Sequence, residues 1–575
     1  MSNLISGAEI LMRSLIDQGV KDIFGYPGGT IMPVYDKLYD FTDRINHYLA
    51  RHEQGAIHAA EGFARVTGKT GVVFATSGPG AMNLLTGLND ALIDSTPIVA
   101  ITGQVATAFL GKDAFQESDI VSVTLPVTKW TIQVRKAEDI AFAIAKAFYI
   151  ANSGRPGPVV VDLTKDAQTG LAEYKLQTCS SIRSYHPNPE IKDSVILEAA
   201  ELINKAERPM ILAGHGIAIA NAENLLLKLA EKAQIPVGCT MLGLSSIPSD
   251  HPLYKGMLGM HGNIGANINT NKSDVILALG MRFDDRVTGD VKKYAPDAKI
   301  IHIDIDASEF DKCVKSDVHV HGCVRQALEK LIPFINEAEH GEWLESFTPH
   351  EYAEQTKVTD REVNAFTPNG KMLMGEVISK VSKAFGDDAV LVTDVGQNQM
   401  FAVKYFNFKS PRSIVTSGGL GTMGFGLPSS IGAKIGAPDR NVVLFVGDGG
   451  FQMTIEELGM VMEYNLGVKI VLLNNNFLGN VRQWQHLFFN GRFSATPMIN
   501  PDFRMIADAY GIPAEDVANR DELDNAIKRM AEHTGAYLLN INIEPTDMVF
   551  PMTPPGSGVD EILVAENEYY KPATN

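Results

Sequence analysis

Two short motifs in the C-terminal part of the chain carry groups suited to binding a metal ion and a phosphate. Gly447-Asp448-Gly449 and Leu473-Asn474-Asn475 each include or follow the end of an apolar run that is typical of a buried parallel strand. Such strands end at one sheet edge, so we expect the two motifs to lie together. The glycines let backbone N–H groups approach phosphate oxygens, and Asp448 and Asn475 offer the oxygen ligands that Mg2+ prefers. A helix expected to begin near Thr454 would point its positive end at the same place. Gly-Asp-Gly alone more often forms a simple turn, and it is the pair of motifs that predicts a site for Mg2+ and phosphate.

A carboxyl group near the N-terminus is a candidate for acid–base chemistry. Glu53 stands in Arg51-His52-Glu53-Gln54-Gly55, just before a helical stretch of small residues at 56–64. A carboxyl group held beside an apolar cofactor ring could exchange a proton with it. The helix dipole alone also favours a negative charge at a helix N-terminus, and the local sequence leaves both interpretations open.

Charged residues also follow two strands of the middle segment. The run 282–286, Arg-Phe-Asp-Asp-Arg, comes after the expected strand 275–279, and the run 302–306 lies at the next strand. Such residues commonly contact the ribose and phosphates of a ligand, although a surface ion-pair cluster is the alternative. Trp484, one of three tryptophans, is a further candidate for a ligand pocket, although most tryptophans pack in a core.

Two other glycine-rich stretches only mimic nucleotide-binding motifs. Residues 419–424 match G-x-G-x-x-G, but no acidic residue follows the next strand at the distance that a dinucleotide site requires. Residues 62–70 resemble a P-loop, but they have one residue too many between the glycines and lie between a helix and a strand in the wrong order. We therefore reject the P-loop and regard the other match as weak.

The elements that must position these residues alternate along the whole chain. Apolar runs rich in Val and Ile are separated by helix-length segments, which predicts an α/β protein with several doubly wound parallel sheets. The expected strands are 71–76, 98–102, 159–163, 210–213, 275–279, 300–304, 390–393, 442–446 and 468–473. Polar stretches at 167–193 and 337–370 read as linkers and divide the chain into three segments. The first and third segments share an order of helix, strand, glycine turn and strand, although any two α/β domains look alike at this level.

Composition excludes several classes of function. The chain has 575 residues, with 50 Lys and Arg against 68 Asp and Glu, and a net charge of -18. A protein of this charge without a basic cluster is not expected to bind nucleic acid. No apolar run is long enough to span a membrane, and Ser6 with Glu9 predicts a capped helix at the N-terminus instead of a signal peptide. Four cysteines without metal-ligand spacing suggest a cytoplasmic protein.

Taken together, the motifs resemble one family of thiamine-diphosphate-dependent enzymes, the acetolactate synthase (acetohydroxyacid synthase) catalytic large subunits. The Gly-Asp-Gly and Asn-Asn motifs are typical of the superfamily, and the run 282–286 with Gln483-Trp484 narrows the resemblance to this family. Further matching segments are 25–29, 51–54, 76–80, 113–117, 153–158, 259–262, 421–426 and 478–484.

The resemblance implies a fold, an activity, cofactors and partners. It implies three doubly wound parallel-sheet domains of the thiamine-diphosphate-binding fold, of which the first and third are similar. These would be a pyrimidine-binding domain at 1–185, an FAD-binding domain at 190–345, and a diphosphate- and Mg2+-binding domain with a C-terminal tail at 365–575. The activity would be decarboxylation of pyruvate and ligation to pyruvate or 2-ketobutyrate, the first common step of branched-chain amino-acid biosynthesis. A homodimer or tetramer is implied because the thiamine site lies between subunits, together with a small regulatory subunit and a non-redox FAD.

The resemblance also assigns site residues position by position. Glu53 would bind the pyrimidine ring, Met423 would hold the cofactor bent, Arg286 would bind the acceptor carboxylate and Trp484 would shape the acceptor pocket. Gly29, Phe115, Gln116 and Lys165 would line the reaction centre. Thiamine diphosphate would contact Glu53, Gln397, Asn398, Gly421, Met423, Asp448, Gly449, Gly450 and Asn475. Mg2+ would be bound by Asp448, Asn475 and the backbone carbonyl of Phe477. FAD would contact Arg155, Gly214, Gly216, Thr240, His261, Arg282, Asp304 and Gly322.

Some positions depart from the family pattern. Asn398 stands where the family usually has His, and Gly450 where it has a small polar residue. Asn480 replaces a Met, and Cys323 replaces an Asp. Ala106 stands where plant relatives have Pro. These departures leave the cofactor affinities and herbicide sensitivity open. Pyruvate oxidase, glyoxylate carboligase and FAD-free catabolic acetolactate synthases are the rival enzymes. Glu53 argues against glyoxylate carboligase, the run 282–286 together with Gln483-Trp484 against pyruvate oxidase, and the run 282–286 against the FAD-free synthases. A non-enzymatic homologue would require loss of the chemistry residues, all of which are present.

Overall fold

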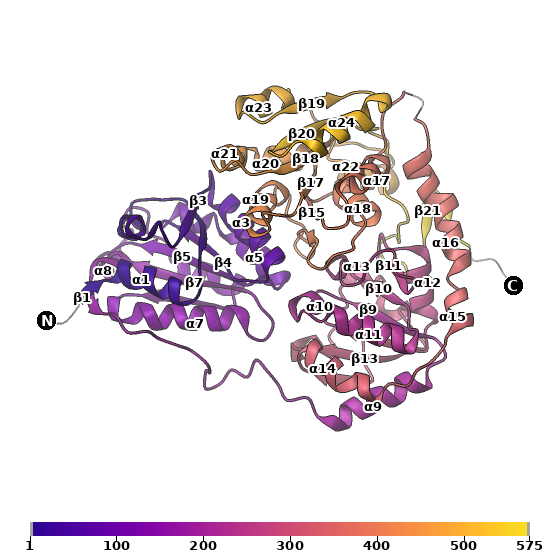
Figure 1. Ribbon diagram of the computed structural model, residues 1–575, viewed down its shortest axis with the longest axis horizontal. Helices are drawn as coiled ribbons and strands as arrows, with labels where there is room; N and C mark the ends of the chain where they lie inside the picture. The colour runs from indigo at the N-terminus through magenta and orange to yellow at the C-terminus, as the bar shows by residue number, and fades with distance from the viewer. Residues whose placement is uncertain (1–3, 368, 572–575) are drawn as a thin grey trace.

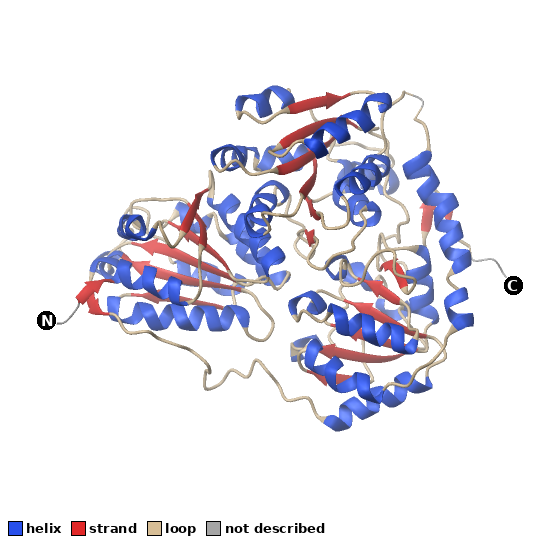
Figure 2. Ribbon diagram, in the orientation of Figure 1, coloured by secondary structure: helices blue, strands red, loops and turns tan. Residues whose placement is uncertain are grey.

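The computed structural model describes residues 4–367 and 369–571, and it contains three six-stranded parallel sheets with helices on both faces (Figures 1 and 2). The first sheet belongs to the N-terminal part, the second to the middle and the third to the C-terminal part. Every pairing within these sheets is parallel. The α/β class with three doubly wound sheets is therefore confirmed.

The first sheet has the order β3-β2-β4-β5-β7-β6. Its strands are β2 Asp22–Gly25, β3 Asn46–Leu49, β4 Gly71–Ala75, β5 Ile98–Gln104, β6 Trp130–Val134 and β7 Pro158–Thr164. Its helices are α1 Gly7–Asp17, α2 Met32–Leu38, α3 Glu53–Thr67, α4 Pro79–Met82, α5 Leu85–Ile93, α6 Ile120–Thr124, α7 Ile140–Asn152 and α8 Lys165–Thr169. A small antiparallel pair, β1 Leu4–Ser6 with β8 Leu171–Glu173, closes this part. As expected, the Ser6 hydroxyl caps α1 by accepting from the backbone N–H of Glu9 at 3.2 Å.

The second sheet has the order β11-β10-β9-β12-β13-β14, the strand order of a dinucleotide-binding fold. Its strands are β9 Pro209–Ala213, β10 Val237–Cys239, β11 Tyr254–Met257, β12 Val275–Leu279, β13 Lys299–Asp304 and β14 Val318–His321. Its helices are α9 Asp193–Lys205, α10 Gly216–Ile219, α11 Glu223–Ala233, α12 Ile264–Lys272, α13 Asp285–Thr288 and α14 Val324–Leu331.

The third sheet, β16-β15-β17-β18-β20-β19, repeats the strand order of the first when the strands of each are numbered from its own start. The similar layout of the two segments in the sequence therefore extends to the topology. Its strands are β15 Val390–Thr393, β16 Ile414–Val415, β17 Val442–Gly447, β18 Val468–Asn474, β19 Ala514–Val517 and β20 Tyr537–Asn542. Its helices are α17 Met374–Phe385, α18 Gln397–Tyr405, α19 Gly426–Gly436, α20 Asp448–Met453, α21 Leu458–Glu463, α22 Gly479–Phe488, α23 Phe503–Ala509 and α24 Arg520–Glu532. A short pair, β21 Leu563–Ala565 and β22 Glu568–Tyr569, lies in the C-terminal tail.

Two expectations about local structure were wrong. A helical stretch does begin at Ile455, beside Thr454, but the helix that starts at the Gly-Asp-Gly motif is a separate one, α20, which begins at Asp448 itself. The two glycines after Asp448 take helical backbone conformations where a turn was expected. The stretch 337–370 contains helices α15 Gly341–Glu345 and α16 Thr348–Glu354, and a π-helix at Gln355–Asn364. Buried Trp343 and Phe347 pack this stretch onto the second sheet, where the Trp343 indole donates to the Pro209 carbonyl at 2.8 Å.

Helices α3 and α19 join the first and third sheets and occupy equivalent places in the two similar folds (Figure 1). Helix α3 is rich in Gly and Ala and α19 in Gly and Ser, and these small residues let the two backbones approach closely. A Cβ atom at Gly62 would lie 1.9 Å from the Ser429 carbonyl oxygen, and one at Gly432 would lie 1.7 Å from the Ala59 carbonyl oxygen. One buried apolar cluster runs through this contact from Phe24 to Leu538, so the first and third parts share a core.

Gly432→Ala should destabilise the fold by about 1–3 kcal/mol, because the added methyl group overlaps a backbone carbonyl that cannot move aside. Thermal unfolding monitored by circular dichroism measures the change. Gly341→Ala is the matched control, since a Cβ atom there meets nothing within 4 Å. An unfolding temperature of Gly432→Ala equal to that of the control would contradict the close helix contact.

Candidate functional site at the sheet edges and the central cavity

Oxygen-bearing side chains gather at the carboxyl edge of the third sheet. Asp448 is buried and starts α20 directly after β17, and Asn475 follows the adjacent β18. Asn500 bridges the two strands, because its amide donates to Asp448 Oδ2 at 2.6 Å and to Asn474 Oδ1 at 3.0 Å. The Phe477 backbone N–H donates to Asn475 Oδ1 at 3.0 Å, which fixes that side chain. Burial raises the pKa of Asp448, while the Asn500 hydrogen bond opposes the rise.

The first turn of α18 supplies two more of the expected residues. The Asn475 amide donates to Gln397 Oε1 at 3.5 Å, and the Asn398 amide donates to the Phe445 carbonyl at 3.2 Å. A Cβ atom at Gly479 would lie 2.1 Å from Gln397 Oε1, so this close packing requires glycine. Gln397, Asn398, Asp448 and Asn475 therefore line one edge. The strand pattern predicts this position for Asp448 and Asn475, whereas Gln397 and Asn398 were assigned by the family resemblance.

Asp394 is a central residue that sequence reasoning missed. Its buried carboxylate accepts hydrogen bonds from the backbone N–H groups of Gly424 and Gly426, at 3.0 and 2.9 Å to Oδ2. These bonds hold the segment that directly follows Met423. A Cβ atom at Gly450 would lie only 2.2 Å from Asp394 Oδ1, which explains why glycine stands at that position. A signal was present, because Asp394 follows directly on strand β15, as Asp448 follows β17.

This edge suits a hard cation bound together with a diphosphate. Among the described residues, no group of three or more His, Cys, Asp or Glu side chains could hold a metal ion by itself. Asp448 is a single carboxylate beside neutral amide and carbonyl oxygens. Mg2+ is commonly bound by one or two carboxylates, with phosphate and water oxygens completing its coordination, so this set fits.

Glu53 lies at the carboxyl edge of the first sheet, at the start of α3. The Asn83 amide donates to Glu53 Oε2 at 2.9 Å, and a Cβ atom at Gly80 would lie 2.8 Å from Oε1. Glu53 is 8% exposed. Glu457 of the third part holds the residues just before α3, because its carboxylate accepts from the backbone N–H groups of Arg51 and His52 at 3.0–3.1 Å, while the His52 side chain caps the helix.

The same edge carries the other residues that the family resemblance assigns to the first part. They come from the ends of different strands: Gly29 after β2, Phe115 and Gln116 after β5, and Lys165 after β7. Phe115 is 87% exposed. In the described part of the chain, no hydrogen bond or ion pair joins Glu53 to Met423, Asp448 or Asn475. These two groups of candidate residues, at the first-sheet edge around Glu53 and at the third-sheet edge around Asp448, are called half-sites here.

A cavity of about 770 Å3 lies between the three parts of the molecule. It contains six of the eight residues assigned to FAD: Arg155, Gly216, Thr240, His261, Arg282 and Asp304. The other two serve packing, since a Cβ atom at Gly214 would lie 2.2 Å from the Gly280 carbonyl oxygen and one at Gly322 would lie 2.3 Å from Ile191. Arg286, Trp484, Gly421 and Cys323 also line the cavity. The structure thus brings Arg286 and Trp484 together with the residues assigned to FAD.

Buried titratable groups give this cavity its electrostatic character. Burial raises the pKa of Asp304 to about 7 and lowers the pKa of His261 to about 4. Arg155 pairs with Glu309 at 2.8 Å and with Asp306 at 3.4 Å. The cavity therefore offers guanidinium groups for phosphates and carboxyl groups that can accept from hydroxyls. Ligands of the dinucleotide class carry both phosphates and hydroxyls.

Comparison with known families identifies the class of protein. Residues 5–123 match the N-terminal TPP (thiamine pyrophosphate, also called thiamine diphosphate) binding domain of thiamine pyrophosphate enzymes, 196–331 match their central domain, and 394–541 match their C-terminal TPP binding domain. The three sheets lie in or around these ranges. The chain is thus a thiamine-diphosphate-dependent enzyme.

Individual relatives narrow this class to one family. The acetolactate synthase large subunit of Lactococcus lactis is 41% identical, over 97% of this chain and 96% of the relative. The acetolactate synthase isozyme 2 large subunit of Escherichia coli is 42% identical, over 97% and 99%. A probable acetolactate synthase large subunit of Methanocaldococcus jannaschii is 43% identical, over 97% and 95%. The chain belongs to the family of acetolactate synthase large subunits.

Proposed function

We propose that the chain is the catalytic subunit of an acetolactate synthase. It decarboxylates pyruvate and joins the two-carbon fragment to a second 2-ketoacid. Pyruvate as acceptor gives 2-acetolactate, and 2-ketobutyrate gives 2-aceto-2-hydroxybutyrate. This reaction is the first common step of branched-chain amino-acid biosynthesis. The observation that carries the proposal is the meeting of Arg286 and Trp484 with the residues assigned to FAD in one cavity, in a chain of this family.

Thiamine diphosphate, when bound, supplies an electron sink for the decarboxylation. The third-sheet edge holds its diphosphate through Gln397, Asn398 and the backbone of Gly449 and Gly450. Mg2+ is bound by Asp448, the Asn475 amide oxygen and the Phe477 carbonyl. The geometric support is the Asn500 bridge, which fixes Asp448 relative to the Asn474–Asn476 turn.

Glu53 holds a proton against the pyrimidine ring of the cofactor. Asn83 fixes one carboxyl oxygen, and the missing side chain at Gly80 leaves room beside the other. A positioned carboxyl group of this kind contributes to proton transfer without contacting the substrate. Met423 supports the cofactor from the opposite half-site, where Asp394 holds the neighbouring Gly424.

The two half-sites are completed by a second copy of the chain. Among the described residues of one chain, no hydrogen bond or ion pair links Glu53 to Met423, Asp448 or Asn475, and apolar side chains that a partner would cover are exposed at the first-sheet edge. These are Tyr26, Met32, Phe109 and Phe115. We therefore propose a homodimer as the smallest active unit, with a tetramer as a further assembly.

FAD occupies the central cavity without taking part in redox chemistry, because the ligation involves no net oxidation. Arg155 and Arg282 are placed to bind its phosphates, and Asp304 to accept from its hydroxyls. Arg286, 62% exposed at its side chain, binds the carboxylate of the incoming ketoacid from the same wall.

Two wider expectations complete the proposal. The relatives are named large subunits, and we propose that this chain also binds a smaller regulatory subunit. Four free cysteines support a cytoplasmic location. Among the described residues, no helix is both long enough and apolar enough to cross a membrane.

The activity is tested by incubating the purified chain with pyruvate, thiamine diphosphate, Mg2+ and FAD. Acetoin measured after acidification reports 2-acetolactate. Acetoin formation that depends on all four components is expected, and its absence in the complete mixture would refute the proposed function.

Glu53→Gln should bind thiamine diphosphate normally but lose about 100-fold or more of the rate of product formation, because the amide cannot hold the exchangeable proton. Cofactor titration and acetoin assay on one preparation separate the two effects. Near-normal turnover would exclude the proton-holding role of Glu53.

Asp448→Ala should weaken Mg2+ and thiamine diphosphate binding together by about tenfold or more, because it removes the only carboxylate of the metal set. Calorimetric titration of the cofactor at several Mg2+ concentrations measures both. Asp439→Ala, an exposed change in the same domain, is the control. A titration identical to that of the control would remove Asp448 from the site.

Trp484→Leu should lower the preference for 2-ketobutyrate over pyruvate as acceptor by about tenfold, since one or two lost hydrocarbon contacts change selectivity by this order. The product ratio in mixtures of the two acids measures it. Phe489→Leu, at an exposed side chain just after the same helix, is the control. An unchanged ratio would show that Trp484 does not select the acceptor.

A further inference from the structure

The segment 417–422, called the junction loop here, connects the two cofactor sites of the chain. Ser417 to Gly421 line the central cavity, and Met423 of the thiamine half-site follows immediately. The loop is therefore the shortest covalent path from one site to the other.

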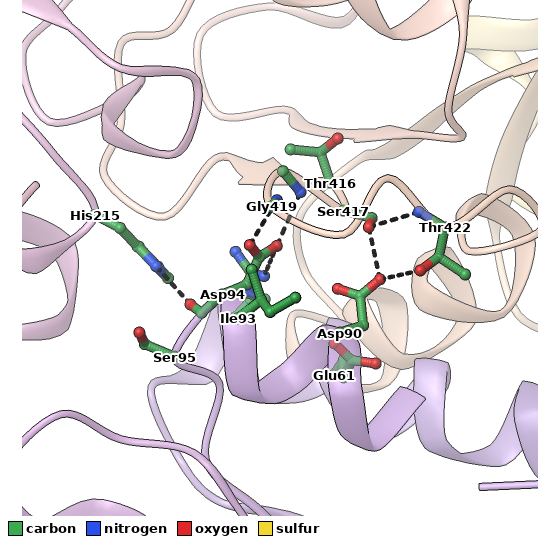
Figure 3. A network of polar contacts seen from close by, with 12 residues as sticks. Glu61, Asp90, Ile93, Asp94, Ser95, His215, Thr416, Ser417, Gly419 and Thr422 are labelled. Atoms are coloured by element: carbon green, nitrogen blue, oxygen red, sulfur yellow. Dashed lines mark hydrogen bonds and ion pairs between the residues drawn. The ribbon is translucent and has the colours of Figure 1, made fainter. Parts of the chain in front are cut away.

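Asp94 of the first domain holds the beginning of this loop (Figure 3). Its Oδ2 accepts from the Gly418 backbone N–H and its Oδ1 from the Gly419 backbone N–H, both at 2.8 Å. Arg65 pairs with the same carboxylate at 2.8 Å. Charge-assisted bonds of this kind are stronger than neutral ones, and they fix two consecutive peptide groups.

Asp90, one helical turn earlier on α5, closes the loop on itself. Its Oδ2 accepts from the Ser417 hydroxyl at 2.6 Å and from the Thr422 hydroxyl at 2.5 Å. The Thr422 backbone N–H donates to Ser417 Oγ at 2.9 Å. Both ends of the junction loop are thus tied to one carboxylate of the first domain (Figure 3).

The second domain contacts the loop and its anchor as well. The His215 ring donates to the Asp94 backbone carbonyl at 3.0 Å, and His215 lines the cavity. A Cβ atom at Gly418 would lie 2.7 Å from Leu242, and one at Gly419 would lie 2.1 Å from Ile93. The loop is therefore packed between the first and second domains without space to shift freely.

Met423 lies between two carboxylate anchors of different domains. Upstream, Asp90 and Asp94 hold the loop from the first domain. Downstream, Asp394 of the third domain holds the N–H groups of Gly424 and Gly426. The position of Met423 therefore depends on how the first domain holds the wall of the cavity.

The buried carboxyl groups around Asp90 lower the stability of the folded protein. Burial and the charge of Asp94 raise the pKa of Asp90 to about 6. The hydrogen bonds from the Ser417 and Thr422 hydroxyls and the charge of Arg65 lower it in part. Burial also raises the pKa of Glu61 well above its usual range. Asp90 Oδ1 and Glu61 Oε2 are buried without a hydrogen-bond partner among the described residues. Such groups destabilise a protein and tend to persist at functional positions.

We propose that Asp90 and Asp94 are positioning residues that couple the central cavity to the thiamine half-site through the junction loop. This rests on the proposed function. A flavin seated against Ser417–Gly421 holds the loop, and with it Met423, in the arrangement that receives thiamine diphosphate. By linkage, each cofactor then raises the affinity for the other by the same factor.

The test measures binding to the cofactor-free full-length protein and needs no turnover. FAD is titrated by its fluorescence with and without saturating Mg2+ and thiamine diphosphate, and thiamine diphosphate is titrated calorimetrically with and without FAD. In the wild-type chain, thiamine diphosphate should lower the dissociation constant of FAD by roughly fivefold or more, and FAD should lower that of thiamine diphosphate by the same factor.

Asp94→Asn keeps the size of the side chain but replaces a charged two-oxygen acceptor by a single neutral acceptor. It should reduce the coupling to less than about twofold while each cofactor still binds alone. Asp90→Asn should act in the same way. Ser417→Ala, a smaller change that removes one donor to Asp90, should give an intermediate coupling, and it tests the proposal if the aspartate variants fail to fold.

Asp162→Asn is the matched control. Asp162 is a buried carboxyl of the same domain, bonded to Thr102, Gln104 and Gln133 and not to the junction loop. This variant should lose stability but keep the full coupling. Coupling lost equally in the control would show that the effect follows general destabilisation and would overturn the proposal.

The remaining outcomes are distinct. Independent binding of both cofactors to the wild-type chain, or full coupling in folded Asp94→Asn and Ser417→Ala, would overturn this inference alone. A wild-type chain that binds neither cofactor would overturn the proposed function and the inference with it.

Discussion

The contact between α3 and α19 is the constraint on which the rest of the molecule depends. Gly62 and Gly432 allow two backbones to pack at a separation that no side chain could occupy. This contact fixes the first sheet against the third. Because Glu53 stands at the start of α3, the same contact determines where Glu53 lies relative to the molecule's surface. It also brings the end of α5 beside the junction loop, since α5 packs on α3. A small shift of one helix would therefore alter both half-sites at once.

Three buried carboxylates in this structure hold backbone N–H groups, and two of them do so across a domain boundary. Glu457 of the third domain holds the residues just before α3 of the first, and Asp94 of the first holds the junction loop of the third. Asp394 acts within the third domain, where it holds the segment after Met423. Each carboxylate accepts from two or more peptide groups, which offsets part of the cost of burial. The domains are thereby joined by directional bonds as well as by shared apolar cores.

Much of the fold could be predicted from the sequence, because strands buried on both faces produce uninterrupted apolar runs. The expected strands 275–279 and 390–393 agree with β12 and β15 at both ends. The edge positions of Asp448 and Asn475 followed from the same pattern. Asp394 carries the same signal, since it directly follows β15. Asn500 and Asp94 could not be found in this way, because their roles depend on contacts between segments far apart in the chain. The start of α20 at Asp448 was missed since glycine pairs are common to turns and to tightly packed helices.

The shared core has a consequence for the synthesis of the chain. The apolar face of α3 is covered by α19, which begins at Gly426, about 360 residues after α3 ends at Thr67. At ribosomal rates of about 5–20 residues per second, the first domain waits roughly 20 to 70 s for this cover. During that interval a strip of alanine, isoleucine and phenylalanine is open to other nascent chains, so chaperones that shield it would govern the yield of folded protein.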